Sequence, residues 1–262
     1  SLACRGGFAA SPGVNGPIKR LGLSELEASL AGTTLRGQLA FSGGAATPVT
    51  FDLATDTLDF DRLAGLSGTG GSGGGVRAEG KLRADRLLVR GLEVKNAAAM
   101  LREADGRIEA ELTGADLLGG RLAGKIENDP SGRITANLHL TGAEAAKLPG
   151  NLGLSGALSA KASLETALPK PGRSRTFKAT LEAEVPQLGQ GTGADRLVLA
   201  NPKLVASLTA RDAPSGSDDL PLDASVTVTC PGTPRLRDIR LTAKGGLVLD
   251  KTGRLREGGP AK

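Results

Sequence analysis

"DLLGGRLAGKIEND", residues 116–129, places two glycines, Gly119 and Gly120, inside an apolar stretch that then resumes with apolar residues at every second position. Glycine readily adopts the positive φ values that tight turns require, and an apolar period of two is typical of a strand that is buried on one side. We therefore predict a β-hairpin here, with Gly119 and Gly120 forming its turn.

The same alternation recurs along most of the chain. Residues 177–185, "FKATLEAEV", carry apolar side chains on one face and Lys, Thr and Glu on the other, and residues 204–210 and 220–228 repeat the pattern. Turn signals separate these segments, at 31–34, 104–106, 129–132, 148–150, 169–172 and 250–253. The sequence predicts a mainly β protein, built as an elongated, curled antiparallel sheet in the form of a meander or groove.

Three segments also carry helix signals. Residues 24–30, "SELEASL", have capping-box spacing, and residues 96–104, "NAAAMLREA", are rich in helix formers. We interpret both as strands. Residues 141–148, "TGAEAAKL", combine a threonine that could cap a helix with a proline that would end it. We predict a short helix there, within a fold that has one or two short helices.

Aromatic platforms and basic clusters are scarce. The chain has five Phe and neither Trp nor Tyr, so the surfaces on which single-stranded nucleic acids stack are almost absent. The net charge of +5 comes from 33 basic and 28 acidic residues that are interspersed along the chain. This pattern indicates a solvated face rather than a site for a polyanion. We expect no nucleic-acid partner.

Motifs for catalysis and cofactor binding are missing or weak. No P-loop, zinc-protease, nucleophile-elbow or EF-hand pattern occurs. A GxGxxG match at 68–73 lies inside a glycine-rich segment, 67–80, with no helix-forming run after it, so we interpret that segment as a flexible loop. His139 alternates with apolar neighbours and is expected on the exposed face of a strand. We expect no enzyme, no catalytic residue and no cofactor, although a site assembled from distant loops stays a weaker alternative.

One close series of carboxylates could hold a hard cation. It lies in "FDLATDTLDFD" and consists of Asp52, Asp56, Asp59 and Asp61. The series lacks the glycine turn of a calcium loop. We interpret it as the wet face of a strand followed by a helix cap, and we expect no metal site.

The two ends of the chain bear on its cellular context. No apolar run approaches the roughly 18 residues of a membrane span, and the chain opens with neither a signal peptide nor a Met. We interpret it as a piece of a longer protein whose anchor or export signal lies elsewhere. Cys4 and Cys230 could form a disulfide in an oxidising compartment or remain two free thiols.

Residues 81–148 resemble the C-terminal conserved region of the AsmA family. The elements that carry the resemblance are "LLVRGLEV" at 87–94, Asp105-Gly106, "ELTGADLLGGRLAG" at 111–124 and "ANLHLTG" at 136–142. Residues 33–63 are similar to the repeat that precedes this region in such proteins. The glycine-rich loop is an expansion of the joint between the two repeats, and residues after 150 follow the family only as a general β pattern.

The resemblance implies a division of the chain and a cellular role. It implies an upstream β repeat at 1–66, the flexible loop at 67–80, an AsmA-like repeat at 81–149, and further strands of the same sheet at 150–262. It also implies a periplasmic protein tethered to the inner membrane of a Gram-negative bacterium and related to bridge-like lipid transfer proteins. Such proteins carry a β-groove with a hydrophobic floor and are linked to phospholipid transport and outer-membrane assembly.

On this interpretation the chain binds phospholipid acyl chains on its apolar face. The candidate floor residues are Phe51, Leu53, Ile108, Leu112, Leu117, Leu122, Ile126, Ile134, Leu138 and Leu140. The same alternation fits an ordinary core, and hence a ligand-free β-sandwich or solenoid with a structural or protein-interaction role. Unpaired strand edges could also lead to edge-to-edge self-association.

Overall fold

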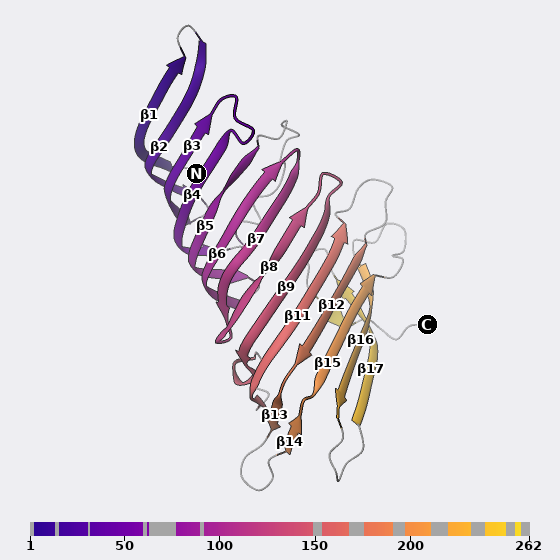
Figure 1. Cartoon of the computed structure of the whole chain (residues 1–262). Helices are drawn as coiled ribbons and strands as arrows, with labels where there is room; N and C mark the ends of the chain where they lie inside the picture. The colour runs from indigo at the N-terminus through magenta and orange to yellow at the C-terminus, as the bar shows by residue number, and fades with distance from the viewer. Residues whose placement is uncertain are drawn as a thin grey trace. The chain divides into compact units, whose positions relative to one another are not determined.

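The computed structural model is almost entirely β-sheet (Figure 1), which confirms the predicted fold class. The structure describes residues 3–13, 16–30, 32–59, 62, 77–89, 92–148, 154–167, 176–190, 197–210, 220–231, 239–249 and 255–257. The strands of one sheet of 15 follow each other in the order β1-β2-β3-β4-β5-β6-β7-β8-β9-β11-β12-β15-β16-β17-β18. Three short strands, in the order β10-β13-β14, form a separate sheet.

The chain divides into two compact units, and each has its own set of strands. The N-terminal unit comprises residues 1–117 and 122–130, and the C-terminal unit comprises residues 118–121 and 131–262. The strands of the first are β1 (Ala3–Gly13), β2 (Gly16–Leu30), β3 (Thr33–Ser42), β4 (Val49–Asp59), β5 (Ala78–Val89), β6 (Leu92–Ala104), β7 (Arg107–Leu117) and most of β8 (Gly120–Asn128). Those of the second are β9 (Arg133–Glu144), β10 (Leu154–Ser155), β11 (Ala157–Ala167), β12 (Phe177–Glu184), β13 (Gln187–Gln190), β14 (Leu197–Ala200), β15 (Lys203–Ala210), β16 (Leu220–Cys230), β17 (Ile239–Leu249) and β18 (Leu255–Glu257). The predicted division at 66, 80 and 149 separates sequence repeats, whereas the two units are separated by compactness. The predicted division therefore stays a prediction.

One neighbouring pair of strands departs from the antiparallel arrangement that we predicted. β4 and β5 run parallel, with Val49 opposite Ala78 and Asp59 opposite Leu88. The amide of Val49 also donates to the carbonyl of Arg77 at 3.2 Å, just ahead of β5. Two parallel neighbours need a crossover connection, which falls between Asp59 and Arg77 in the sequence. Residues 67–76 of the glycine-rich segment, with the GxGxxG match, lie outside the described residues, whereas residues 78–80, which we predicted as the end of the flexible loop, are instead the first residues of β5. Period-two alternation is the same for both strand directions, so the sequence pattern could not reveal this pair.

The hairpin predicted at 116–129 is confirmed, with its turn one residue earlier than expected. The central residues of the turn are Leu118 and Gly119, with φ values of 53° and 81°. Positive φ at both central positions is the geometry of a type I′ turn, whose twist matches that of the flanking strands. Gly120 is already the first residue of β8. The turn is held in place by the amide of Glu144, which donates to the carbonyl of Leu118 at 2.9 Å.

Other predicted turns lie where the sequence placed them. Gly32, with a φ of 83°, lies between β2 and β3, and Asp105 and Gly106, with φ values of 53° and 78°, join β6 to β7. Residues 129–132 join β8 to β9. The turn signals at 169–172 and 250–253 lie outside the described residues, as does most of that at 148–150.

The helix signals are overridden by strand pairing. Residues 24–30 and 96–104 lie in β2 and β6, as predicted. The helix predicted at 141–148 is wrong: β9 continues to Glu144, and only a single 3₁₀ turn, η1 (Ala145–Lys147), follows. Ala143 pairs with Leu158 of β11 and is completely buried, and Ala145 is also buried. Burial at alternate positions is the pattern of a strand, and it outweighs the modest helix propensity of alanine and glutamate.

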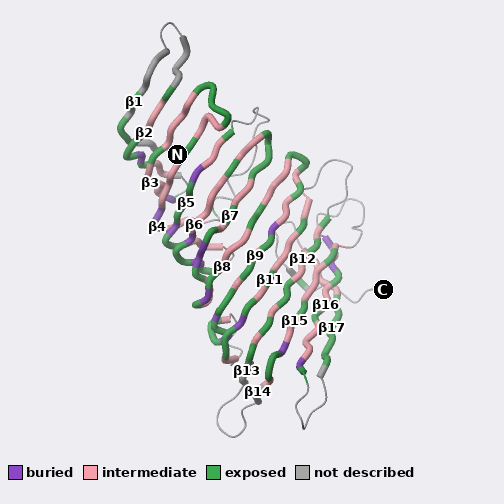
Figure 2. Tube along the Cα trace, in the orientation of Figure 1, coloured by how far each residue is buried: buried purple, intermediate pink, exposed green. Residues whose placement is uncertain are grey.

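Few of the described residues are buried (Figure 2), and half of the buried apolar residues are alanines. The N-terminal unit has one buried cluster, formed by Ala84, Val94, Ala97 and Ala115 and flanked by Leu58, Leu87, Leu112, Leu117 and Leu122. The C-terminal unit has another, formed by Ala143, Ala145 and Leu158 and flanked by Leu118, Leu140, Leu148, Leu154, Ala160 and Val185. Most other apolar side chains are only half-buried, as expected for a sheet with one layer.

Cys230 is a buried free thiol, and its Sγ donates to the carbonyl of Ala200 at 3.5 Å. The disulfide left open by the sequence is therefore not formed by this residue. The side chain of Cys4 lies outside the described residues. Within the described part of the chain, no helix is both long enough and apolar enough to span a bilayer.

Candidate functional site

The strands of the C-terminal unit bring apolar side chains together in rows. Directly opposed residues on neighbouring antiparallel strands point to the same face of a sheet. One row crosses six strands, from β9 to β17, and consists of Leu138, Ala162, Leu181, Ala206, Val226 and Ala243. The row two residues toward one end of the strands consists of Leu140, Ala160, Ala183, Leu204, Val228 and Leu241. The row on the other side consists of Ala136, Leu164, Ala179, Leu208, Ala224 and Gly245. We call these three rows the C-terminal apolar face.

This face is open as well as apolar. Leu181 in its middle is 39% exposed, Val226 is 37% exposed and Leu241 is 64% exposed. Six strands at about 4.8 Å and three rows at about 7 Å span roughly 24 Å by 14 Å between residue centres. That is a few hundred Å², the size of the largest apolar patches on monomeric proteins, which are often functional. No helix of the described residues lies across it.

At one end of the strands, the C-terminal apolar face adjoins a buried cluster. The buried cluster around Ala143 and Leu158 packs against Leu140 and Ala160, which belong to the end row of the face. Leu118, from the turn between β7 and β8, joins the same cluster. The apolar surface therefore continues into a small true core at this end of the strands.

The opposite face of the same strands is polar. Its rows include His139 opposite Lys161, which lies opposite Glu182. Lys203 lies 3.3 Å from Glu184 and 3.6 Å from Glu182. A hydrogen bond to Glu184 and the nearby charge of Glu182 raise the pKa of Lys203 above its ordinary value. His139 is exposed on this face, as the alternation predicted. The sheet thus separates an apolar side from a charged side.

The N-terminal unit repeats this separation. One row across β2 to β7 consists of Leu23, Leu39, Phe51, Gly80, Leu101 and Ala110. The next consists of Leu26, Gly37, Leu53, Leu82, Ala99 and Leu112. These rows form the N-terminal apolar face. Beyond the first row, Glu103 stands between Ala78 and Ile108, so the uninterrupted apolar rows end there.

Two of the glycines in these rows make room for a neighbouring strand. A Cβ at Gly80 would collide with the ring and carbonyl of Phe51, and a Cβ at Gly37 would collide with the backbone of β4 at Asp52. Gly37 also has a φ of 147°, which other residues rarely adopt. At these two positions a larger apolar residue is sterically excluded.

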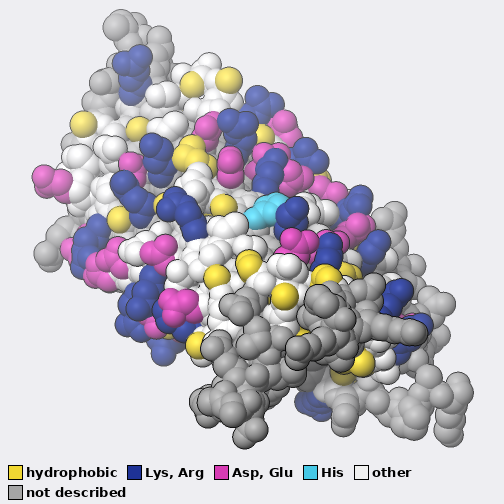
Figure 3. Space-filling view, turned by 60° about the horizontal axis from the view of Figure 1, so that its bottom comes forward, with side chains coloured by type: hydrophobic (Ala, Val, Ile, Leu, Met, Phe, Trp, Pro, Cys, Tyr) yellow, Lys and Arg dark blue, Asp and Glu magenta, His cyan; other side chains and the backbone are white. Residues whose placement is uncertain are grey.

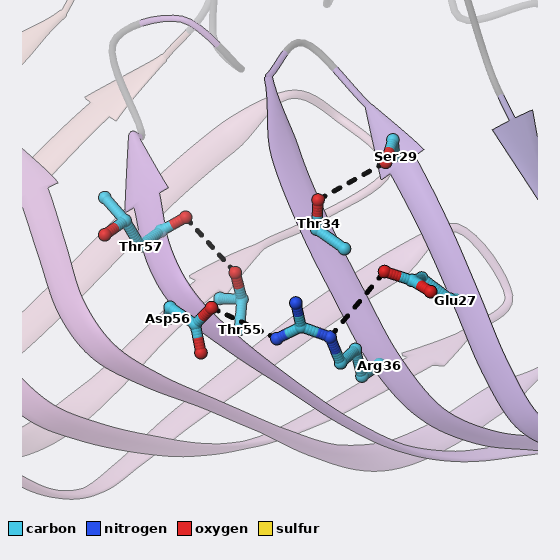
Figure 4. A network of polar contacts seen from close by, with 7 residues as sticks. All are labelled: Glu27, Ser29, Thr34, Arg36, Thr55, Asp56 and Thr57. Carbon is cyan, nitrogen blue, oxygen red and sulfur yellow. Dashed lines mark hydrogen bonds and ion pairs between the residues drawn. The ribbon is translucent and has the colours of Figure 1, made fainter.

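Ion pairs cover the polar side of the N-terminal unit. Arg36 on β3 reaches Asp56 on β4 at 3.1 Å and Glu27 on β2 at 3.8 Å (Figure 4). The hydrogen bond to Asp56 raises the pKa of Arg36. Asp52 likewise lies 2.6 Å from an arginine, Arg83.

Beside the Arg36 ion pairs, the same strands carry neutral hydrogen bonds, one between β2 and β3 and one within β4. The hydroxyls of Ser29 and Thr34 lie 3.3 Å apart, and Thr55 donates to the carbonyl of Thr57 at 3.2 Å (Figure 4). A space-filling view shows acidic and basic side chains intermixed over one side of the molecule (Figure 3). Exposed pairs of this kind contribute little stability each, and their main effect is to keep this side hydrated.

The aspartate series does not form a cation site among the described residues. Asp52 and Asp56 each face an arginine, and Asp59 pairs with Arg62 at 3.3 Å. Asp59 also accepts a hydrogen bond from the amide of Arg62 at 3.0 Å, as a helix-capping residue would. Asp61 lies outside the described residues. No group of three or more His, Cys, Asp or Glu side chains comes together within the described ranges.

The surface of the described residues has shallow hollows, and some of them include residues of the apolar faces. A depression of about 440 Å³ in the N-terminal unit is lined in part by Leu23, Leu39 and Phe51 of the N-terminal apolar face, together with small and polar residues such as Ala40 and Thr50. In the C-terminal unit a depression of about 720 Å³ lies at the ends of β12, β15, β16 and β17, beside Lys203 and Arg240. The apolar faces are open surfaces rather than cavities.

The predicted floor residues divide between the two units. Phe51, Leu53 and Leu112 lie in the rows of the N-terminal apolar face, and Ile108 extends it beside Glu103 with 47% of its surface exposed. Leu117 and Leu122 pack against the buried cluster of that unit. Lys125 pairs with Glu109 on the polar side at 3.3 Å, so alternation along β8 places Ile126 on the apolar side. Leu138 and Leu140 lie in the rows of the C-terminal apolar face, and Ile134 continues that face along β9.

Sequence reasoning left out the larger part of the C-terminal apolar face. The omitted residues include Leu181, Leu204, Leu208, Val226, Val228 and Leu241. Most of them lie in segments whose period-two pattern was recognised as β-strand. They were not named as floor residues because the family resemblance ends near residue 148. Alternation alone would have found them.

Comparison with protein-family models, with curated proteins and with solved structures finds no significant match to this chain.

Proposed function

We propose that this chain is a non-enzymatic lipid-binding module that shelters phospholipid acyl chains on its apolar faces. The observation that carries the proposal is the C-terminal apolar face, whose three rows contain no polar side chain across six strands. Covering an exposed surface of this kind with apolar groups is favourable in water.

Acyl chains fit such a surface for two physical reasons. The backbone of the inner strands is already paired with its neighbours, so the face offers almost no hydrogen bond to a polar ligand. Affinity must then come from buried area, at about 0.8 kcal/mol for each buried CH₂ group. A chain of many CH₂ groups supplies that area without a specific polar partner.

The wider role follows from the resemblance to the AsmA family. In this proposal the chain is part of a periplasmic protein tethered to the inner membrane, and it contributes to phospholipid transport and outer-membrane assembly. The charged sides of both units would keep the sheet hydrated while the apolar faces hold the lipid. The resemblance rests on 33–63 and 81–148, so the role of the last hundred residues is supported by their apolar face alone.

The test is lipid content. We expect the chain, purified without detergent from a Gram-negative host, to carry phospholipid that is visible by native mass spectrometry and identified after organic extraction. Leu138→Asp places a charge in the middle row of the C-terminal apolar face, and we expect that variant to lose most of the lipid bound there. Leu181→Asp should act in the same way, and its position is more exposed, so the charge disturbs folding less.

The matched control is Asn137→Asp, which adds the same charge at the adjacent position on the polar face and should leave the lipid content unchanged. Circular dichroism and thermal unfolding verify that all three variants are folded. A ligand-free wild-type mass, or folded variants that keep their lipid, would contradict the proposal. The first outcome would favour a ligand-free structural or protein-interaction domain.

A further inference from the structure

The outer edge of β17 is incompletely paired. β18 pairs only with Leu247, Val248 and Leu249, so residues 239–246 have β16 as their one strand neighbour among the described residues. On the β16 side, the register runs from Leu220 opposite Leu249 to Cys230 opposite Ile239 without a shift. Alternate residues of this regular eight-residue stretch therefore present N–H and C=O groups that have no strand partner among the described residues, which is a template for another strand.

The other edge strand of the sheet is built differently. β1 has register shifts between Arg5 and Gly7 and around Pro12. Bulges and prolines are features with which natural sheets prevent strand addition. β17 has neither a proline nor a shift in its pairing with β16. This difference indicates that the edge of β17, and not that of β1, is suited to pairing.

The side chains of residues 239–246 indicate which kind of partner strand could pair with this edge. Leu241, Ala243 and Gly245 lie on the apolar face, whereas Arg240, Thr242 and Lys244 lie on the polar face. All of them are exposed. Arg240 and Lys244 form no ion pair with any described residue, although most other arginines of the described strands have an acidic neighbour. An added strand would place its own alternate residues beside these two cations.

We propose that residues 239–246 of β17 form a docking edge for an extended segment of a partner protein whose alternate residues are apolar and acidic. The apolar residues would extend the row that ends at Leu241, and the acidic residues would neutralise Arg240 and Lys244. A second copy of this chain fits less well: antiparallel pairing of two β17 strands centred on Thr242 sets Arg240 opposite Lys244. Like charges directly opposite each other disfavour that pairing. This inference is independent of lipid binding, because it rests on the strand edge.

A synthetic peptide tests the edge. The probe is a fluorescently labelled eight-residue peptide of alternating valine and glutamate, and its binding to the full chain is measured by fluorescence anisotropy. We expect saturable binding of this peptide. A control peptide of the same length that alternates valine and lysine should not bind. Arg240→Glu combined with Lys244→Glu should weaken binding of the acidic peptide at least about tenfold and allow the lysine peptide to bind.

Two N-methylated peptides separate strand pairing from simple charge attraction. Each carries N-methyl groups on one set of alternate residues, and only one set has N–H groups that face β17 in a β-ladder. We expect one peptide to lose binding and the other to keep it. Equal binding of both, or no binding of the unmodified acidic peptide, would overturn the proposal. Dimers of the chain in analytical ultracentrifugation that are abolished by the double variant would assign the edge to self-association instead.

Discussion

Replacing Gly120 with alanine is expected to lower the free energy of unfolding of the C-terminal unit by about 2–3 kcal/mol. The added Cβ would lie 2.7 Å from Cα of Ala143 and closer still to the amide nitrogen of Ala143 and the carbonyl oxygen of Thr141. These are backbone atoms of β9, and β9 is held on its other side by β11, where Ala143 pairs with Leu158. These backbone atoms cannot move without breaking the hydrogen bonds between β9 and its neighbours. The cost is therefore steric and cannot be relieved by a change of rotamer.

Denaturant unfolding followed by circular dichroism measures this cost. Gly245→Ala is the matched control in the same unit, because a Cβ at Gly245 would have no atom within 4 Å. The control should change the unfolding free energy by less than about 0.5 kcal/mol. Equal effects of the two substitutions would show that β8 does not approach β9 as closely as described. Gly120, the second glycine of "LLGG", thus allows the backbone of β9 to lie close to β8, whereas Gly119, the first, supplies positive φ.

Leu222→Ala is expected to destabilise the C-terminal unit by about 2–5 kcal/mol. Leu222 is completely buried, between Ala210 of β15 and Leu247 of β17 in the strand register. Its truncation removes apolar contacts and leaves a void that the paired backbones of three strands cannot close. Leu222 is the largest fully buried side chain among the described residues, so we expect no other single leucine truncation there to cost more.

Leu241→Ala provides the comparison, since it makes the same chemical change on the next strand. Leu241 is 64% exposed, so its truncation should cost less than about 0.5 kcal/mol. Thermal and denaturant unfolding of both variants measures the difference. A large cost at Leu241 would mean that the end row of the C-terminal apolar face is covered, which would also weaken the case for lipid binding there.

Local pattern was sufficient to predict the elements of this fold. Many strands are indicated by alternation, as in residues 177–185, and several turns by residues that accept positive φ, as in Asp105-Gly106. The two errors have a common cause. The helix expected at 141–148 and the antiparallel direction expected throughout were judged from neighbours in sequence, whereas pairing with β11 and the parallel contact of β4 with β5 come from residues far away along the chain.

The candidate site was predictable in kind and only partly in extent. Phe51, Leu53 and Leu112 could be named because they alternate with polar residues, and pairing does place Leu53 and Leu112 in one row. The free edge of β17 could not be anticipated in the same way. It depends on β18 being much shorter than β17, and strand length is a matter of pairing rather than of composition.

Alternation of side chains, turn chemistry and overall charge follow from local covalent geometry, and the sequence alone is enough to establish them. They specify that the chain forms amphipathic strands with one apolar side. Which strands become neighbours, in which direction, and whether their apolar sides meet in a continuous row depend on hydrogen bonds and packing between residues that are distant in sequence. Only the tertiary structure decided that the apolar rows cross six strands and stay partly exposed, because exposure depends on what packs above a residue and not on the residue itself.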